Sequence, residues 1–358
     1  TRAIVRKASD VHFDPARERL QIRFRLDGLL QEADHLPVSL AENVVARLKV
    51  LAGLLTYRKD IPQEGAFRAD TSWLNGSGPV DVRVATFPTV QGERAVLRLM
   101  YGLGKVSDLD DLGLAPETVA ELRAAAERPQ GLILVTGPAG SGKSTTLYAL
   151  ARHILAATGG RSVVSIEDPV EQRICGINQI QVQPHGELTY VRAMRSLLRQ
   201  DVEVLLVGEI RDAETAHIVT EAALTGHLIM STLHSGDPAE ALGRLLEMGI
   251  ASYQVVSAVT LVVSQRLLRT ACPDCQGHGS CAACMSTGFV GRTACGQIAV
   301  IDDTLRQAVL DHRPITELRA IIARDRPDLA ADANRLVQQN ITSADEVRRV
   351  LGSLVPRA

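Results

Sequence analysis

The segment with the clearest chemical signature in this sequence is a glycine-rich run at residues 137–144. It reads Gly-Pro-Ala-Gly-Ser-Gly-Lys-Ser and fits the phosphate-loop pattern G-x-x-x-x-G-K-[ST]. An apolar run precedes it and a helical pattern follows, which is the context that such a loop requires. Its backbone N–H groups would converge on phosphate oxygens, helped by the dipole of the following helix. The residues predicted to bind a nucleoside triphosphate are Gly137, Pro138, Ala139, Gly140, Ser141, Gly142, Lys143, Ser144 and Thr145.

Two side chains of this run would act directly on the phosphates and their metal ion. Lys143 would reach the β- and γ-phosphates, and the Ser144 hydroxyl would ligate Mg²⁺. The alternative is a glycine-rich turn with no ligand, which the flanking strand and helix patterns argue against. We therefore predict a site for ATP and Mg²⁺.

Carboxylates follow two of the predicted buried strands. Glu167, Asp168 and Glu171 come at and after the end of one strand, and Glu209 ends another. In doubly wound sheets, ligands bind at the carboxyl ends of the strands, where carboxylates can hold Mg²⁺ or orient an attacking water. We predict that Glu209 lies near the metal and that Glu167 is the water-activating base, with Asp168 and Glu171 as the other candidates for the base. The alternative for any single acid is that it caps a helix or solvates a strand end.

Two histidines bracket a further predicted strand of the same sheet. His227 precedes this strand and His234 follows it. A lone histidine is more often structural than catalytic. Because these two flank a strand in the same sheet as the phosphate loop, we expect them to sense the γ-phosphate.

Several arginines are candidates for neutralising the charge that develops during phosphoryl transfer. The default interpretation of any one of them is a solvated basic face. The candidates are Arg195 and Arg199, which share one helical face with Arg192; Arg211, which follows the acidic strand; and Arg83 and Arg98, which lie on predicted strands of the N-terminal region and would act from the first domain or from a neighbouring subunit.

Four of the six cysteines form the pattern C-x2-C-x5-C-x2-C. Two such knuckles can place four thiolates tetrahedrally around Zn²⁺, and a site with no open position would be structural. Free thiols are the alternative, and the five-residue spacer is short for a zinc site. We expect the other two cysteines, Cys175 and Cys295, to be unpaired and buried. The predicted zinc ligands are Cys272, Cys275, Cys281 and Cys284.

Composition narrows the class of protein. The chain has 358 residues, of which 46% are hydrophobic and 22% are charged, and its net charge is −2. This charge and the aromatic content of 3% argue against a dedicated nucleic-acid binder. No apolar run reaches the ~18 residues of a membrane helix, and the start lacks the apolar segment of a signal peptide. We expect a cytoplasmic protein and, because the chain lacks an initiator Met, an N-terminal region beyond this sequence.

The patterning divides the chain into two regions. The first hundred residues alternate as half-buried strands around one helical segment, with a loop at 75–79. After residue 129, short apolar strands alternate with amphipathic helices, which predicts a parallel sheet with helices on both faces. We therefore predict an α/β fold with one domain at 1–101, a linker at 102–112, and a second domain at 113–358 that includes the zinc-binding element at 270–292.

The order of these motifs resembles that of the GspE/PilB type II/IV secretion ATPase family, in particular the GspE-type ATPase of the type II secretion system. The likeness lies in the Walker A run, Glu-Asp-Pro at 167–169, Leu-Val-Gly-Glu-Ile-Arg-Asp at 206–212, and the Leu-Thr-Gly-His and Ser-Thr-Leu-His runs. Ser264-Gln-Arg-Leu fits as well. Phe24-Arg-Leu-Asp-Gly and Pro88-Thr-Val-Gln-Gly-Glu look like the family's PAS-like N-terminal (N2) domain. The tetracysteine element looks like that of the assembly and secretion branch.

The resemblance implies a RecA-like P-loop NTPase domain preceded by a smaller PAS-like α/β domain, a homo-hexameric ring, and ATP bound between the two domains. It implies that Arg83 and Arg98 reach the nucleotide, and it makes Arg195, Arg199 and Arg211 functional candidates. It further implies a cytoplasmic ATPase motor, peripheral to the bacterial inner membrane, that powers type II secretion by pseudopilus assembly. The implied partners are a bitopic docking protein and a polytopic platform protein of the inner membrane, with no nucleic acid.

Three other functions compete with this interpretation. The first is assembly of a type IV pilus or a competence pseudopilus, which uses the same chemistry. The second is a RecA-like nucleic-acid translocase, against which the near-neutral charge and scarce aromatics count. The third is a nucleotide-binding scaffold without turnover, against which the complete acidic and phosphate motifs count.

Overall fold

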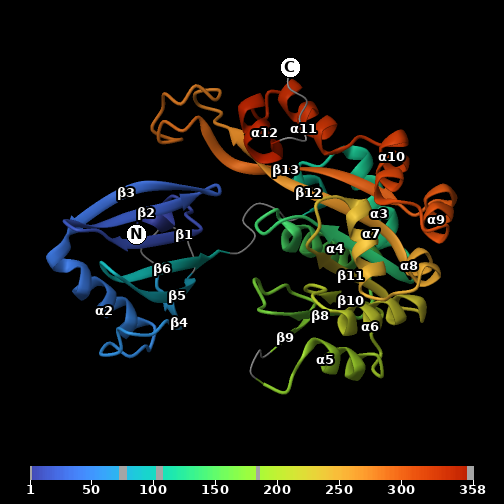
Figure 1. The fold of residues 1–358 in the computed structure, drawn as a ribbon, viewed down its shortest axis with the longest axis horizontal. Coiled ribbons are helices and arrows are strands. Elements are labelled where there is room, and N and C mark those ends of the chain that lie inside the picture. The colour runs from blue at the N-terminus through green and yellow to red at the C-terminus, as the bar shows by residue number, and fades with distance from the viewer. Residues whose placement is uncertain (1, 72–78, 102–107, 183–185, 353–358) are drawn as a thin grey trace. The chain divides into compact units, whose positions relative to one another are not determined.

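The computed structural model describes residues 2–71, 79–101, 108–182 and 186–352, and the chain divides into two compact units (Figure 1). The division falls between Gly104 and Lys105, within the predicted linker. Most of the predicted loop at 75–79 lies outside the described residues. Among the described helices, none is both long enough and apolar enough to cross a bilayer.

The first unit is built on one antiparallel sheet of six strands in the order β3-β2-β1-β6-β5-β4. Buried and exposed residues alternate along β5, as the sequence of a half-buried strand predicts. One sheet face packs with Val45 and Leu48 of α2 in the core of this unit. Its elements are α1 (Arg2–Val5), β1 (Asp10–Pro15), β2 (Arg19–Leu26), β3 (Leu29–Pro37), α2 (Ala41–Leu51), β4 (Gln63–Ala69), β5 (Val80–Thr89) and β6 (Gly92–Met100).

The second unit is built on a sheet of seven strands in the order β13-β12-β7-β11-β10-β8-β9. Neighbouring strands from β12 to β9 run parallel, and β13 pairs antiparallel with β12. The strands are β7 (Gly131–Thr136), β8 (Val163–Glu167), β9 (Asn178–Gln181), β10 (Val204–Val207), β11 (Leu228–Leu233), β12 (Val259–Ala271) and β13 (Phe289–Val300).

Every residue of β7, β10 and β11 is buried, which shows that both faces of this second sheet are covered by helices. The predicted parallel α/β architecture is therefore confirmed for this unit. Its helices are α3 (Pro116–Ala126), α4 (Lys143–Thr158), α5 (Tyr190–Leu197), α6 (Ala213–Leu224), α7 (Pro238–Glu247), α8 (Ser252–Ala258), α9 (Asp303–Leu310), α10 (Ile315–Asp325), α11 (Leu329–Gln338) and α12 (Ala344–Leu351).

The last part of the predicted linker belongs structurally to the second unit. Leu109–Leu112 forms a short 3-10 helix, and its two leucines are buried. Asp108 caps this helix by accepting a hydrogen bond from the Leu109 N–H. Burial of its two leucines stabilises this segment against the second unit, which the short run Leu-Asp-Asp-Leu did not indicate in the sequence.

The long strands β12 and β13 extend beyond the rest of the sheet. The pairing of β12 with β7 ends at Ser264 and Thr136, whereas its pairing with β13 continues to Ala271 and Phe289. We call this extension, residues 265–271 and 289–296, the arm. The tetracysteine residues lie in the loops that join its two strands.

Candidate nucleotide site and tetracysteine centre

The phosphate loop connects the end of β7 to the start of α4, as the sequence predicts. Gly137 and Gly142 have φ angles of 145° and 90°, which residues with a Cβ rarely adopt. A Cβ at Gly137 would lie 2.6 Å from the Gln265 carbonyl oxygen, so close packing also requires glycine there. The loop is therefore shaped by its glycines, and α4 begins at Lys143 with its N–H groups at the loop.

Lys143 closes the loop onto itself. Its Nζ donates to the carbonyl oxygens of Gly137 at 2.8 Å and Pro138 at 3.1 Å. Burial lowers the pKa of Lys143, and the nearby Glu209 carboxylate partly offsets this effect. The ammonium group is thus held at the mouth of the loop, where a triphosphate would compete with the two carbonyls for it.

Gln265 of β12 fixes the loop from the neighbouring strand. Its Nε2 donates to the Ser141 carbonyl at 2.7 Å, and its Oε1 accepts from the Thr146 hydroxyl at 2.9 Å. The side chain is buried, and these two bonds give both the nitrogen and the oxygen of its amide a partner. Sequence reasoning noticed this glutamine only as part of a family-like run, because its partners lie more than a hundred residues earlier in the chain.

A cavity of about 370 Å³ opens at the carboxyl ends of the central strands, next to the phosphate loop. Residues from seven segments of the chain line it, which places the predicted phosphate and acidic motifs at one site. Arg292 of β13 and Leu267 of β12 also line it, and sequence reasoning assigned neither to the site. Its lining residues include Gly140, Ser141, Gly142, Lys143, Ser144, Thr145, Glu167, Asp168, Glu171, Tyr190, Glu209, Thr232, His234, Leu267 and Arg292.

Glu209 and His234 lie together in this cavity. Glu209 forms an ion pair with Arg211, and its Oε2 lies 3.6 Å from His234 Nε2. The Arg211 guanidinium also lies 3.7 Å from Asp168, so it joins the acids of two neighbouring strands. Burial and then the Lys143 charge lower the pKa of His234, which keeps this imidazole neutral near pH 7.

Glu167 is held by buried donors. Its carboxylate accepts hydrogen bonds from the hydroxyls of Tyr148 and Ser165, and from Gln179 Nε2 at 3.1 Å. The residue is only 5% exposed. Both carboxylate oxygens therefore already accept hydrogen bonds. Glu167 and Glu171 both line the cavity, but only Glu171 is exposed. A base must reach the attacking water, so in this conformation Glu171 has the better access.

The structure separates the two histidines. His234 follows β11 at the cavity, but His227 precedes β11 and lies at the opposite edge of the sheet. Six residues of strand, about 3.3 Å each, stand between them. The His227 Nδ1 lies 3.2 Å from the Ala222 carbonyl oxygen, a local contact after α6. Of these two histidines, only His234 lines the cavity beside the phosphate loop.

The predicted arginines are dispersed. Arg195 of α5 is exposed and donates to Glu214 at 3.2 Å, and Arg199 is exposed after that helix. Neither lines the cavity, whereas Arg211 reaches its acids.

In the first unit, Arg83 and Arg98 face each other across β5 and β6. Arg98 donates to Asp10 of β1 at 3.0 Å, and Arg83 is exposed. The two guanidinium groups therefore occupy the same region of one sheet face. Their predicted action on the nucleotide stays a prediction.

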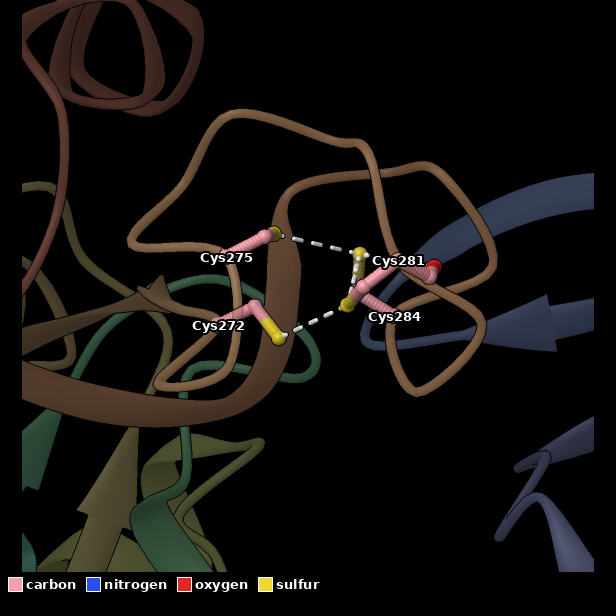
Figure 2. A group of neighbouring side chains, drawn as sticks. All are labelled: Cys272, Cys275, Cys281 and Cys284. Atoms are coloured by element: carbon pink, nitrogen blue, oxygen red, sulfur yellow. Dashed lines mark hydrogen bonds between the residues drawn. The ribbon is translucent and has the colours of Figure 1, made fainter.

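The four cysteines in the loops that join the two strands of the arm converge, as Figure 2 shows. Their sulfur atoms all lie within 4.8 Å of one another, with neighbouring pairs at 3.5, 3.6 and 3.7 Å. Sulfur atoms around a tetrahedral Zn²⁺ with bonds of about 2.3 Å would be about 3.8 Å apart, so this donor set fits zinc. The short spacer thus does not prevent the four thiols from meeting.

Local hydrogen bonding favours a thiolate in this cluster. Burial opposes ionisation of Cys284, yet the Gly288 N–H at 3.3 Å and the neighbouring thiols lower its pKa to about 6. Cys295 is buried as expected, and burial raises its pKa to about 12. The expectation for Cys175 is wrong, because this residue is exposed.

The fold and the cavity together define a P-loop NTPase: a parallel α/β sheet presents a Walker A loop beside acids from its neighbouring strands. Residues 1–349 match the family described as "Type II/IV secretion system protein". The chain therefore belongs to that family, and it is an ATPase of the secretion class. The resemblance and the fold class predicted from the sequence are confirmed.

Individual relatives agree with this assignment. The chain is 39% identical to the type II secretion system ATPase E of Vibrio cholerae, over 97% of the chain and 73% of the relative. It is also 39% identical to the type IV pilus assembly ATPase PilB of Thermus thermophilus, over 96% of the chain and 41% of that longer protein. The chain therefore spans less than half of the length of PilB.

Solved structures support the same fold. The Legionella pneumophila ATPase DotB aligns with a TM-score of 0.75 at 23% identity, over 97% of the chain and 92% of DotB. The pilus retraction motor PilT, solved with bound ADP, aligns with a TM-score of 0.66 at 22% identity, over 97% of the chain and 94% of that chain.

Proposed function

We propose that this chain hydrolyses ATP to power protein secretion through a type II secretion system, by driving assembly of a pseudopilus. The observation that carries this proposal is the single cavity that joins the phosphate loop to Glu171, Glu209 and His234. Phosphoryl transfer depends mainly on positioning and charge stabilisation, and this cavity offers the groups for both.

The loop would bind the triphosphate through its backbone N–H groups. Lys143 would leave the carbonyls of Gly137 and Pro138 and bind the β- and γ-phosphates. Ser144 and Glu209 supply the oxygen donors that Mg²⁺ prefers, and both line the cavity. When bound, Mg²⁺ would neutralise charge on the phosphate oxygens. The neutral His234 would donate or accept one hydrogen bond near the γ-phosphate.

The base that activates water is an open choice between neighbouring carboxylates. Glu167 is buried, and three donors already occupy most of the lone pairs of its carboxylate, which leaves it little capacity to accept a proton from water. Glu171 lines the cavity, and its N–H donates to the Tyr148 hydroxyl at 3.3 Å. We therefore propose Glu171 as the base and Glu167 as the buried acid that anchors Tyr148 below it.

Assembly would complete the site. A homo-hexamer in which Arg83 and Arg98 face the triphosphate would add positive charge to that of Lys143 and Arg292, which line the cavity of one second unit. The exposed Arg195 and Arg199 would then face a neighbouring subunit. Motion between the two units would pass to inner-membrane proteins, namely a bitopic docking protein and a polytopic platform protein, and would place the motor at the cytoplasmic face of that membrane.

We also propose that the tetracysteine centre binds Zn²⁺ structurally. Its four thiols leave no position for a substrate, so the metal would stabilise the tip of the arm.

Turnover and its metal dependence test the ATPase proposal. Mg²⁺-dependent release of phosphate from ATP should fall at least about 100-fold in Glu209→Gln. The matched control is Glu214→Gln, which removes an exposed carboxylate paired with Arg195 and should keep the parent rate to within about twofold. Equal rates in all three proteins would contradict the proposed role of Glu209.

Type IV pilus assembly is the second candidate, supported by the identity to PilB. The two systems differ in the membrane proteins that the motor meets. ATPase stimulation by the purified cytoplasmic domain of a type II secretion docking protein, compared with the corresponding pilus protein, would decide between them. Stimulation by the pilus protein alone would replace the secretion assignment.

A further inference from the structure

The arm carries two of the residues that line the nucleotide cavity. Leu267 lies on β12 and packs close to Gly142 of the phosphate loop, and Arg292 lies on β13. Both strands have left the central sheet at this point, because β12 pairs with β7 only as far as Ser264. The positions of Leu267 and Arg292 relative to the phosphate loop therefore depend on the position of the arm.

A segment near the C-terminal end of the described chain closes the open edge of the arm. We call residues 341–346 the clamp. The Ala271 N–H donates to the Ile341 carbonyl at 2.8 Å, and the Thr342 hydroxyl donates to the Arg269 carbonyl at 2.8 Å. The Arg269 N–H donates to Glu346 at 3.0 Å. These bonds pair the edge of β12 where β7 no longer covers it.

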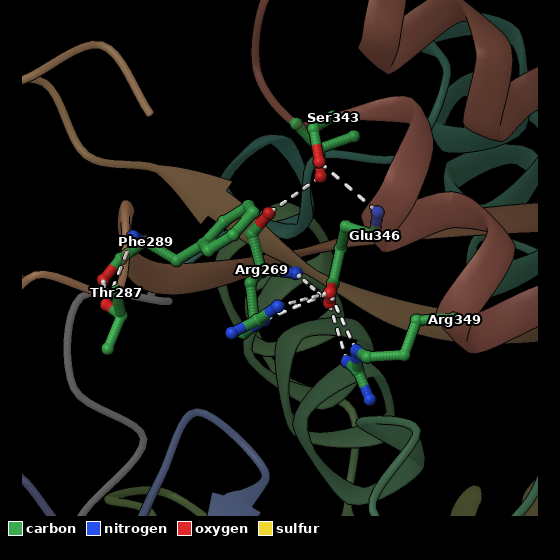
Figure 3. A network of polar contacts seen from close by, with 7 residues as sticks. Arg269, Thr287, Phe289, Ser343, Glu346 and Arg349 are labelled. Atoms are coloured by element: carbon green, nitrogen blue, oxygen red, sulfur yellow. Dashed lines mark hydrogen bonds and ion pairs between the residues drawn. The ribbon is translucent and has the colours of Figure 1, made fainter. Parts of the chain in front are cut away.

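Arg269 is held on two sides, as Figure 3 shows. Its guanidinium donates to Glu346 Oε2 at 2.7 and 3.0 Å, and it lies 4.0 Å above the centre of the Phe289 ring. Phe289 belongs to β13, so this one side chain joins both strands of the arm to α12. Glu346 is 1% exposed and also accepts two hydrogen bonds from Arg349, which belongs to α12 itself.

We infer that Glu346 and Arg269 are positioning residues for nucleotide binding. Arg269 stands directly opposite Arg292 in the β12–β13 pairing and two residues after Leu267, on the same side of its strand. A shift of Arg269 is therefore transmitted to both lining residues within one or two positions. Fixing Arg269 against α12 pre-organises that wall of the cavity and lowers the ordering cost of nucleotide binding.

This inference rests on the proposed binding of ATP at the cavity. The contact between the clamp and the arm would change the affinity for ATP. Glu346 does not line the cavity, so we assign the clamp no direct part in the chemical step. Loss of the clamp should raise the KM for ATP and leave kcat close to that of the parent.

The two arginines that share Glu346 offer a matched pair. Arg269→Met and Arg349→Met each remove one guanidinium from the same buried carboxylate, but only Arg269 belongs to the arm. We expect Arg269→Met to raise the KM and the dissociation constant for ATP about tenfold, and Arg349→Met to change them less than about twofold. Both variants should lose thermal stability, so stability alone cannot produce the difference in KM.

The measurements are steady-state ATPase kinetics and equilibrium titration with a fluorescent ATP analogue, on the full chain. Equal KM values in the two variants, whether raised or unchanged, would overturn the inference. If Arg269→Met does not fold, Arg269→Lys keeps the charge but loses the two-point contact, and it must raise the KM above that of Arg349→Met. If the parent itself binds no ATP, the proposed function fails first, and the parent titration reveals this separately.

Discussion

Gln265→Leu is the most direct way to test how the second unit shapes its phosphate loop. Leucine has nearly the volume of glutamine but makes neither the bond to the Ser141 carbonyl nor that to the Thr146 hydroxyl. The Ser141 carbonyl then loses its partner, whereas Thr146 keeps a weaker 3.4 Å bond to the Gly142 carbonyl. At about 1–3 kcal/mol for each unsatisfied buried group, the free energy of unfolding of this unit should fall by about 2–3 kcal/mol.

Gln265→Leu should weaken ATP binding by more than its loss of folding stability alone would explain. Because Ser141 belongs to the loop, its release should also raise the dissociation constant for ATP, by about tenfold. Thr146→Val is the matched control: it removes one bond to Gln265 and leaves the bond to Ser141 in place. That variant should lose about 1 kcal/mol of stability and keep its ATP affinity to within about threefold.

The assay combines denaturant unfolding, followed by circular dichroism, with titration of a fluorescent ATP analogue. The reasoning would be refuted by a Gln265→Leu protein that binds ATP as tightly as the parent. It would also be refuted if Thr146→Val weakened ATP binding as strongly as Gln265→Leu, because the contact with Ser141 would then be unimportant.

Three further predictions concern the acids and thiols. Glu171→Gln should lower kcat by about 100-fold or more with little change in stability. Glu167→Gln should instead destabilise the protein, because its new amide group would face three donors. If Glu167→Gln lost more kcat per folded protein than Glu171→Gln, the assignment of Glu171 as the base would be reversed. Cys281→Ser should abolish the one equivalent of zinc expected by elemental analysis, and Cys295→Ser should retain it; equal zinc content would exclude the tetracysteine centre. Burial alone would raise the pKa of Glu346, but hydrogen bonds from Arg349 and Arg269 together outweigh it and lower this pKa to about 2. Its stabilising contribution, about 3 kcal/mol above pH 4.5, should therefore be lost as the pH falls from about 4.5 to about 2, and acid unfolding of Glu346→Gln should show a correspondingly smaller pH slope than the parent.

Local sequence signals were sufficient where the structure depends on neighbouring residues. The phosphate loop follows from glycine and lysine spacing, and the buried strands of the second unit follow from short apolar runs. The acids at 167–171 and 209 meet at one cavity because parallel strands end at the same edge of a sheet. The four cysteines between the strands of the arm also meet, although their spacer is short.

Features that depend on distant contacts could not be read from the sequence. Gln265 contacts a loop more than a hundred residues away, and nothing in its immediate neighbours indicates this. The burial of Glu167 results from Tyr148 and Gln179, which come from a helix and an edge strand. The sequence could not distinguish His227 from His234, because it shows that both flank a strand but not which end of that strand lies at the cavity.

The contact between the clamp and the arm has the same origin. The amphipathic pattern of α12 would place an acid such as Glu346 in solvent. In the structure Glu346 is buried against Arg269, which lies on a strand about eighty residues earlier. Two arginines compensate its charge, and this compensation makes burial of the carboxylate possible. Such pairings are determined by the topology that brings α12 to β12.

The measurement that tests this account most directly is ATP binding and hydrolysis by Lys143→Ala. Its ammonium group is held at the mouth of the phosphate loop by two carbonyl oxygens, ready to be exchanged for phosphate. We expect the variant to fold and to lose at least about 100-fold in kcat/KM for ATP. A Lys143→Ala protein that bound and hydrolysed ATP as well as the parent would contradict the nucleotide site.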